Sequence, residues 1–141
     1  MIILKNMEKW KRHTRVFKRC TKDLQKEYFA EGEQKKWERH TRVFEALHKG
    51  IERLGFQNII KRDWQAGLVV TVKYPDDPNW SFSAIHDYCY KRGFTIYPGK
   101  INNTETFRLC ALGAIDQSDI ETFFEVFEAG LREMEVSLPV H

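Results

Sequence analysis

Residues 95–113 contain two short runs of strand-forming residues on either side of a turn-rich loop, which points to a β-sheet. The first run is Thr95-Ile96-Tyr97 and the second is Thr106-Phe107-Arg108-Leu109. The loop between them opens with Pro98-Gly99-Lys100, where Pro fixes φ and Gly admits positive φ. We therefore expect two strands, near 95–97 and 106–111, joined by this loop.

Arg108 has the most specific chemistry in this stretch. Two sets of residues alternate along the second run, Phe107, Leu109 and Ala111 against Arg108, Cys110 and Leu112. We expect Arg108 to lie among apolar neighbours on a largely buried strand. A guanidinium so placed requires an anion, and its planar fork suits a carboxylate or a phosphonate. From the residues alone, a structural ion pair and a site for an anionic ligand both remain open.

The residues around this stretch predict further short elements. Apolar and polar residues alternate over 67–74, which predicts a strand ended by the turn 74–78. Ser81 caps an expected helix that stops at Gly93. The Asp76-Asp77 pair lies between two prolines and is interpreted as an exposed turn.

The last helix has the clearest sequence pattern. Asp116 is its expected N-cap and Asp119 lies in its first turn. One apolar stripe follows, made of Ile120, Phe123, Phe124, Phe127, Leu131 and Met134. Together these elements predict an α+β fold, with a three- or four-stranded sheet, helices packed on one face, and a helical hairpin before it.

Five motifs occur in one order along the second half of the chain: Thr71-Val72-Lys73-Tyr74-Pro75-Asp76-Asp77-Pro78-Asn79, Lys91-Arg92-Gly93-Phe94, Ile96-Tyr97-Pro98-Gly99-Lys100, Thr106-Phe107-Arg108-Leu109 and Ala111-Leu112-Gly113. In this order and spacing they resemble the C-terminal small domain of the 2-aminoethylphosphonate–pyruvate aminotransferases. These are class V, fold-type I enzymes that depend on pyridoxal phosphate. The resemblance covers roughly residues 18 to 136. Cys110 departs from it, because the family usually carries Gly there.

The resemblance implies an activity for the intact family, the transfer of an amino group from 2-aminoethylphosphonate to pyruvate. It implies that Arg108 anchors the carboxylate or phosphonate end of the substrate. Fixing that end would aim the amine at the cofactor. Tyr97, Gly99 and Lys100 would shape a loop beside the substrate, with Lys100 supporting the loop rather than touching the ligand.

The resemblance also implies that this chain lacks the catalytic part. A pyridoxal enzyme requires a Schiff-base Lys, an acidic partner for the ring nitrogen and a cradle for the phosphate. In the family these lie in a large N-terminal domain. We therefore expect a detached small domain that binds no pyridoxal phosphate and is not catalytically competent alone. Its expected partners are a second copy of itself, a chain that supplies the large domain, or a small anionic substrate.

The N-terminal third is predicted to be helical and carries a repeat. Residues 9–17 recur as residues 36–44 with eight of nine positions identical. The offset of 27 residues turns the copies to opposite sides of one straight helix, so a break at Gly32 is expected. We divide the chain into an extension, 1–32, and an aminotransferase-like domain, 33–141.

Three interpretations of the repeat stay open. It is a duplication or engineering scar, a helix that covers the surface left by the missing large domain, or a basic face for nucleic acid. The last interpretation rests on the interleaving of two Trp residues with basic side chains, Arg12, Arg15, Arg39 and Arg42.

Composition restricts the class of protein. The chain has 141 residues, a net charge of +3 and 30% charged residues, which suits one globular core and gives little reason to expect nucleic-acid binding. Three cysteines without metal spacing favour a reducing, cytoplasmic setting, and no membrane segment or zinc site is expected.

Two alternatives to the transaminase fragment remain, a non-catalytic anion- or partner-binding module and a basic helical nucleic-acid module.

Overall fold

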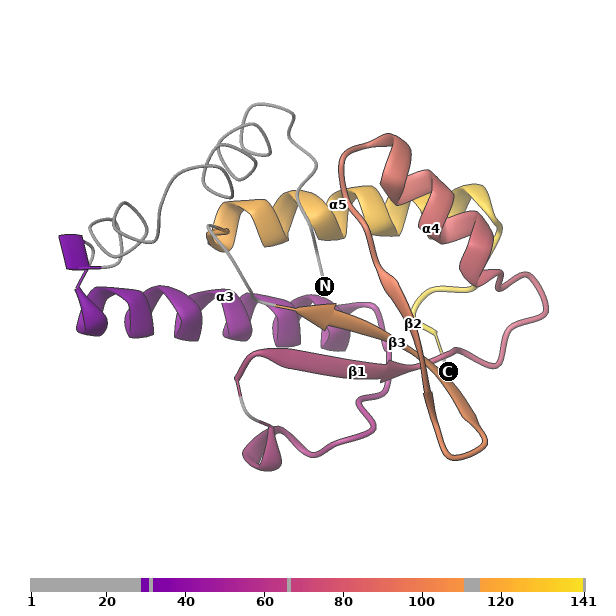
Figure 1. Ribbon diagram of the computed structural model, residues 1–141. Helices are drawn as coiled ribbons and strands as arrows, with labels where there is room; N and C mark the ends of the chain where they lie inside the picture. The colour runs from indigo at the N-terminus through magenta and orange to yellow at the C-terminus, as the bar shows by residue number, and fades with distance from the viewer. Residues whose placement is uncertain (1–28, 31, 66, 111–114, 141) are drawn as a thin grey trace, which may run out of the picture.

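A computed structural model describes residues 29–30, 32–65, 67–110 and 115–140 of the chain (Figure 1). The first copy of the repeat and residues 1–28 of the expected extension lie outside these residues, as does the Ala111-Leu112-Gly113 motif. The division at residue 32 therefore stays a prediction. The described elements are α3 (Glu33–Arg53), the short 3-10 helix η1 (Arg62–Trp64), β1 (Val69–Lys73), α4 (Phe82–Lys91), β2 (Tyr97–Ile101), β3 (Thr104–Cys110) and α5 (Gln117–Glu133).

The described strands form one antiparallel sheet in the order β1-β3-β2, so the last strand in sequence lies in the middle. Thr71 on β1 and Tyr97 on β2 both lie opposite Arg108 on β3. The outer edge of β1 is partly covered by the residues after α3. The amide of Lys73 donates to the carbonyl of Gln57 at 2.9 Å, and the amide of Ile59 donates to the carbonyl of Thr71 at 3.0 Å.

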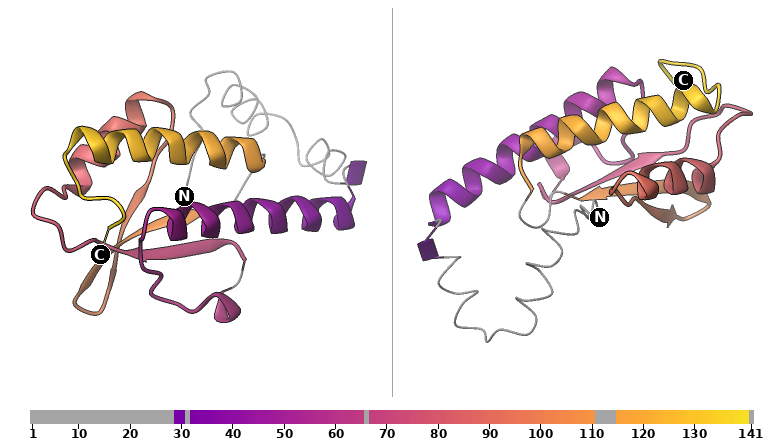
Figure 2. Two further views of the ribbon diagram at one scale, coloured as in Figure 1. Left: turned by 180° about the vertical axis from the view of Figure 1, so that it is seen from behind. Right: turned by 90° about the horizontal axis from the view of Figure 1, so that it is seen from above.

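The helices bury their apolar sides in one core with one face of the sheet. Four apolar side chains of β1 and β3 that are at most 1% exposed form this face, namely Val70, Val72, Phe107 and Leu109. The ring of Phe107 lies 5.6 Å from that of Phe56 and 5.8 Å from that of Phe127 on α5. The predicted α+β architecture, with helices on one face of a small sheet, is confirmed (Figures 1 and 2).

The two long helices approach each other closely. In Figures 1 and 2, α3 and α5 run side by side, and Gly50 of α3 lies directly against the ring of Phe124 of α5. A Cβ on Gly50 would overlap that ring. One turn further along both helices, Arg53 donates to the Glu128 carboxylate at 2.5 Å. The glycine therefore sets how near the helix axes lie.

The helix boundaries agree with the capping signals in the sequence. The Asp116 carboxylate accepts from the amide of Asp119 at 3.1 Å, and the Asp119 carboxylate accepts from the amide of Asp116 at 3.0 Å, which is a complete capping box. Ser81 caps α4 by accepting from the amide of Ala84 at 3.4 Å. Gly93 follows α4 with a φ of 92°, a conformation that glycine adopts without strain.

The hairpin differs from its expected form. The predicted strand at 95–97 is wrong in its bounds, because β2 runs over Tyr97–Ile101. The prediction of a loop that opens at Pro98 is also wrong, because the turn is confined to residues 102–103. Asn102, not Gly99, takes the positive φ, at 54°. An edge strand tolerates Pro98, since the missing amide donor faces away from its single partner strand. None of the described helices is long and apolar enough to cross a membrane.

Candidate functional site

The face of the sheet opposite Phe107 carries the residues of the candidate site, and we call it the Arg108 face. Side chains alternate between the two faces of a strand, and paired residues share a face. The register therefore places these side chains together: Val69, Thr71 and Lys73 of β1, Tyr97, Gly99 and Ile101 of β2, and Thr106, Arg108 and Cys110 of β3.

Strand β3 is largely buried as expected, but Arg108 itself is exposed, so the expectation that it lies among apolar neighbours is wrong. Its sequence neighbours Phe107 and Leu109 point into the core, and the alternation of the strand turns Arg108 to the other face. The apolar flanks of Arg108 in the sequence therefore do not become its neighbours in space. The Arg108 side chain therefore reaches solvent on the side of the sheet away from the core.

Gly99 allows the side chain of Arg108 to lie close to β2. An ideal Cβ built on Gly99 would lie 3.0 Å from Nε of Arg108 and 2.7 Å from Oγ1 of Thr106. Both distances are shorter than ordinary van der Waals contact, so the two side chains occupy the space that a side chain at position 99 would need. The guanidinium and the Thr106 hydroxyl therefore converge over the bare backbone of Gly99.

The structure brings three of the four expected site residues to one face. Tyr97 is 41% exposed and lies directly opposite Arg108, and Gly99 lies next to it on the same face. Lys100 pairs with Glu105 and belongs to the other face of the strand, so it does not join them. All three of Tyr97, Gly99 and Lys100 lie on strand β2 rather than on a loop.

A hollow of about 360 Å³ lies beside this part of β2. It is lined by Tyr74, Pro98, Gly99, Lys100 and Glu105. Burial raises the pKa of the Tyr74 phenol, and the nearby Glu105 carboxylate raises it further. The hollow thus offers a neutral hydroxyl, an amine and a carboxylate, and Gly99 separates it from the Arg108 face.

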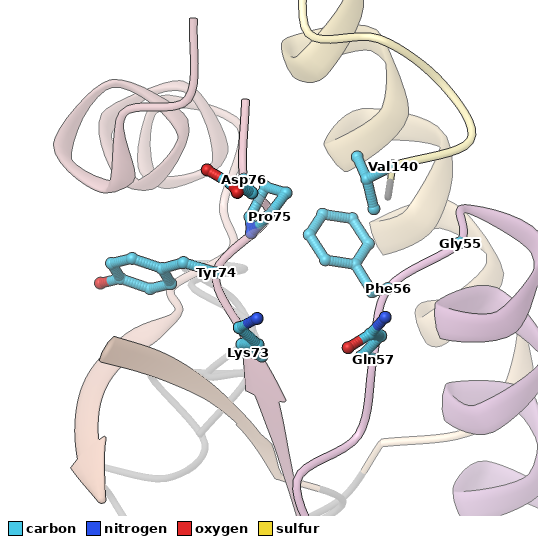
Figure 3. A pocket seen from close by; sticks show the side chains of 8 residues that line it. All are labelled: Gly55, Phe56, Gln57, Lys73, Tyr74, Pro75, Asp76 and Val140. Atoms are coloured by element: carbon cyan, nitrogen blue, oxygen red, sulfur yellow. The ribbon is translucent and has the colours of Figure 1, made fainter. Parts of the chain in front are cut away.

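A second hollow, of about 330 Å³, lies at the end of β1 (Figure 3). Figure 3 shows Phe56 and Val140 on one side of it and Tyr74 on the other. The adjoining Asp77 is structural, because its carboxylate accepts from the amides of Asn79 at 2.8 Å and Ser137 at 3.0 Å. These two hydrogen bonds hold the pKa of Asp77 below its usual value. They tie the turn after β1 to the C-terminal segment, and the interpretation of this pair as a turn agrees with the structure.

The described residues do not fit the cofactor of a pyridoxal enzyme. Each hollow includes a single Lys, Lys73 or Lys100, and both residues are exposed. Lysines that form Schiff bases are usually activated by desolvation or by a neighbouring cation in an enclosed pocket. In the part of the chain that the structure describes, no group of three His, Cys, Asp or Glu side chains could hold a metal ion.

Curated proteins match part of the chain. The 2-aminoethylphosphonate–pyruvate transaminase 1 of Cupriavidus pinatubonensis is 35% identical over 85 residues, which are 60% of this chain and 22% of that protein. The transaminase 2 of Paraburkholderia xenovorans is 40% identical over 67 residues, which are 48% of this chain and 18% of that protein. The chain resembles one portion of the 2-aminoethylphosphonate–pyruvate transaminases. It spans about a fifth of the length of these relatives, and no protein-family model matches it.

Solved aminotransferases share the fold of most of this chain. The ureidoglycine–glyoxylate aminotransferase of Bacillus subtilis superposes with a TM-score of 0.68 at 19% identity, over 77% of this chain and 28% of that one. The alanine–glyoxylate aminotransferase of a Nostoc species gives a TM-score of 0.67 at 18% identity, over 76% and 29%. At these identities the likeness concerns the fold. The resemblance inferred from the motifs is confirmed.

Sequence reasoning missed a buried polar cluster beside α3. His48 of α3 is 1% exposed, its Nε2 lies 3.1 Å from Oε1 of Gln65, and its Nδ1 lies 3.4 Å from Nδ2 of Asn58. Burial lowers the pKa of His48, and the Arg62 charge lowers it further. The cluster fastens the segment after α3 to that helix. Its sequence signal was the position of His48 beside Leu47 and one turn before Ile51 on the apolar side of α3.

Thr106 was also missed as a candidate site residue. The sequence places Thr106 on the strand that carries Arg108 but gives no sign of its burial. In the structure its side chain is 0% exposed. The available signal was its spacing of two residues from Arg108, which places both on one face.

Proposed function

We propose that this chain is the C-terminal small domain of a pyridoxal-phosphate-dependent transaminase that acts on 2-aminoethylphosphonate and pyruvate. The observation that carries the proposal is the combination of 31–42% identity to transaminases of that name with the placement of Arg108 on an accessible sheet face. In this proposal Arg108 binds the charged end of the substrate through its planar fork. The residue positions the substrate, and the cofactor would supply the amino-transfer chemistry.

The neighbours of Arg108 have supporting roles in this proposal. Tyr97 borders the anion on the β2 side, and Gly99 keeps the space over the strand open for the Arg108 side chain. Lys100 supports β2 through its pairing with Glu105 and does not contact the substrate. Holding a substrate by its charged tail limits the orientations of its amine, which is the contribution that a positioning residue makes.

The domain is proposed to be inactive by itself and to bind no pyridoxal phosphate. The support is its coverage of about a fifth of the relatives and the exposure of Lys73 and Lys100 in its two hollows. It would work with a large domain supplied by another chain, or associate with a second copy. The free thiols of Cys89 and Cys110 are consistent with a reducing, cytoplasmic compartment.

The first experiment tests the proposed inactivity. The 141-residue chain is incubated with pyridoxal phosphate, its visible absorption spectrum is recorded, and borohydride-trapped peptides are mapped by mass spectrometry. We expect no stoichiometric adduct on any Lys. A single fully modified Lys would overturn the proposed inactivity.

The second experiment tests the anion anchor. Binding of 2-aminoethylphosphonate and pyruvate is followed by NMR titration of the backbone amides of β2 and β3. Arg108→Met should abolish the shifts, whereas Lys91→Met removes an equal charge from the end of α4 and should leave them unchanged. Equal binding by the wild type and Arg108→Met would refute the anchor.

The alternative of a non-catalytic anion-binding module is supported by the same Arg108 face. Such a module would also bind the anions and lose them in Arg108→Met, but it would need no transaminase partner. The nucleic-acid alternative gains no support. The guanidinium of Arg39, one of its four arginines, donates to the carbonyl of Ile115 at 3.1 Å. That contact joins the start of α3 to the residue before the α5 cap.

A further inference from the structure

Among the described side chains, three buried polar atoms have no hydrogen-bond partner, Oδ1 of Asn58, Nε1 of Trp80 and Oγ1 of Thr106. Asn58 belongs to the His48 cluster, and the Trp80 ring packs 5.9 Å from the ring of Phe107 on the core side. Thr106 alone of the three belongs to the Arg108 face. Its hydroxyl is therefore a donor without an acceptor beside the proposed anion anchor.

A buried hydroxyl without a partner is unfavourable for the folded protein. Burial removes its hydrogen bonds to water, and nothing in the protein replaces them. A Val of the same shape would avoid this cost, and β-branched apolar residues suit the middle of a strand. A polar residue at such a position is explained if the hydroxyl gains its partner when a ligand binds.

The geometry over Gly99 shows where that partner would be. Oγ1 of Thr106 and Nε of Arg108 lie 2.7 Å and 3.0 Å from one point, the ideal Cβ position of Gly99. The Arg108 side chain lies over the glycine, with its Cγ 3.4 Å from the same point. An anion that draws the exposed guanidinium outward would uncover the hydroxyl and lie within its reach.

We propose that Thr106 is a second ligand of the anion held by Arg108, and that its hydroxyl makes the site select a tetrahedral anion with at least three oxygens, a phosphonate or phosphate, over a carboxylate. This inference rests on the proposed function of Arg108. The Arg fork uses two oxygens of the anion in a bidentate contact. A tetrahedral phosphonate has a third oxygen that points out of that plane, and a Thr hydroxyl has one hydrogen to donate to it. A carboxylate has no third oxygen.

The test measures the affinity of the full 141-residue chain for inorganic phosphate and for acetate at constant ionic strength, by NMR titration. The variants are Thr106→Val, Thr106→Ser, Arg108→Met and the charge control Lys91→Met. The measured quantity is the ratio of phosphate affinity to acetate affinity. Comparing this ratio between wild type and Thr106→Val cancels the difference in charge between the anions, because Val leaves every charge in place.

We expect Thr106→Val to lower the phosphate-to-acetate ratio about tenfold, the effect of one hydrogen bond to a charged group. Thr106→Ser should keep the ratio within about twofold, since it retains the hydroxyl. Without phosphate, the Tm of Thr106→Val should equal or exceed that of the wild type, because the variant lacks the unpaired hydroxyl. Lys91→Met should behave as the wild type.

Two results would overturn the inference and leave the anchor intact. One is an unchanged ratio in Thr106→Val while Arg108→Met loses binding of both anions. The other is a lowered Tm for Thr106→Val without phosphate, which would show that the hydroxyl is structural. Phosphate binding that survives Arg108→Met would instead remove the proposed anchor, and the inference with it.

Discussion

Gly99 of β2 and Arg108 of β3 are in such close contact that Nε of Arg108 lies 3.0 Å from the ideal Cβ position of the glycine. The φ of Gly99 is not among the positive values, so this position requires glycine for space and not for backbone conformation. We predict that Gly99→Ala folds, loses about 1–3 kcal/mol of unfolding free energy through crowding against Thr106, and weakens phosphate binding.

Urea denaturation and phosphate titration of the same sample check this prediction. Asn103→Ala, in the exposed turn of the same hairpin, is the control and should leave phosphate binding unchanged. Wild-type affinity in Gly99→Ala would show that Arg108 does not need the space over the glycine.

A second prediction concerns Gly50, which faces the Phe124 ring between the two long helices. Replacing Gly by Ala inside a helix ordinarily stabilises a protein by about 1 kcal/mol. Here the added methyl overlaps the ring, so Gly50→Ala should destabilise the protein by about 1–3 kcal/mol in urea denaturation. The exposed Ala129→Gly on α5 should cost about 1 kcal/mol from helix propensity alone. A more stable Gly50→Ala would mean that the helices move apart at little cost.

The third prediction follows from the lowered pKa of His48. Since the unfolded pKa is about 6.5, the unfolded chain binds the proton more readily than the folded protein does. The contribution of neutral His48 to the free energy of unfolding is therefore complete above about pH 6.5. It falls as the pH drops from there to the pKa of His48 in the folded protein. Each unit of difference between the two pKa values corresponds to about 1.4 kcal/mol.

Urea denaturation at a series of pH values from neutral to mildly acid tests this dependence. The His48→Gln variant lacks the titrating ring, so the difference between the two proteins isolates the contribution of His48. We expect the wild type to lose more stability than His48→Gln on acidification. Parallel pH profiles for the two proteins would refute the assignment.

The fourth prediction concerns the thiol of Cys89, which is 0% exposed. Burial raises its pKa to about 12, although the Arg92 charge lowers it somewhat. The thiolate is the reactive form, so Cys89 should resist a thiol reagent such as iodoacetamide at pH 8 until the protein is unfolded. Mass mapping of the labelled peptides, with and without urea, checks this. Rapid labelling of Cys89 in the native protein would indicate that α4 opens readily.

The α+β fold was predictable from local signals. The capping box of Asp116 and Asp119 and the apolar stripe after it specify α5 within a single stretch of chain. Ser81 and Gly93 do the same for α4. These signals involve residues three or four positions apart, so no knowledge of the tertiary structure is required to interpret them.

The candidate site was predictable only in part, because its geometry depends on long-range pairing. The sequence identified Arg108 but could not show which face of β3 meets the helices, so its exposure was predicted wrongly. Pro98 and Gly99 resemble turn residues until the pairing of β2 with β3 shows that they lie on an edge strand. The contact of Gly99 with Thr106 and Arg108 requires both strands and their register.

The strand order β1-β3-β2 has a consequence for the chain as it leaves the ribosome. Val69–Lys73 emerges well before its partner Thr106–Cys110, whereas β2 emerges immediately before β3 and forms a local hairpin with it. Gln57 and Ile59 are available earlier and bond to β1 through Lys73 and Thr71. During synthesis, one edge of β1 can thus be protected by a preceding segment while the other edge waits for the centre of the sheet to be made.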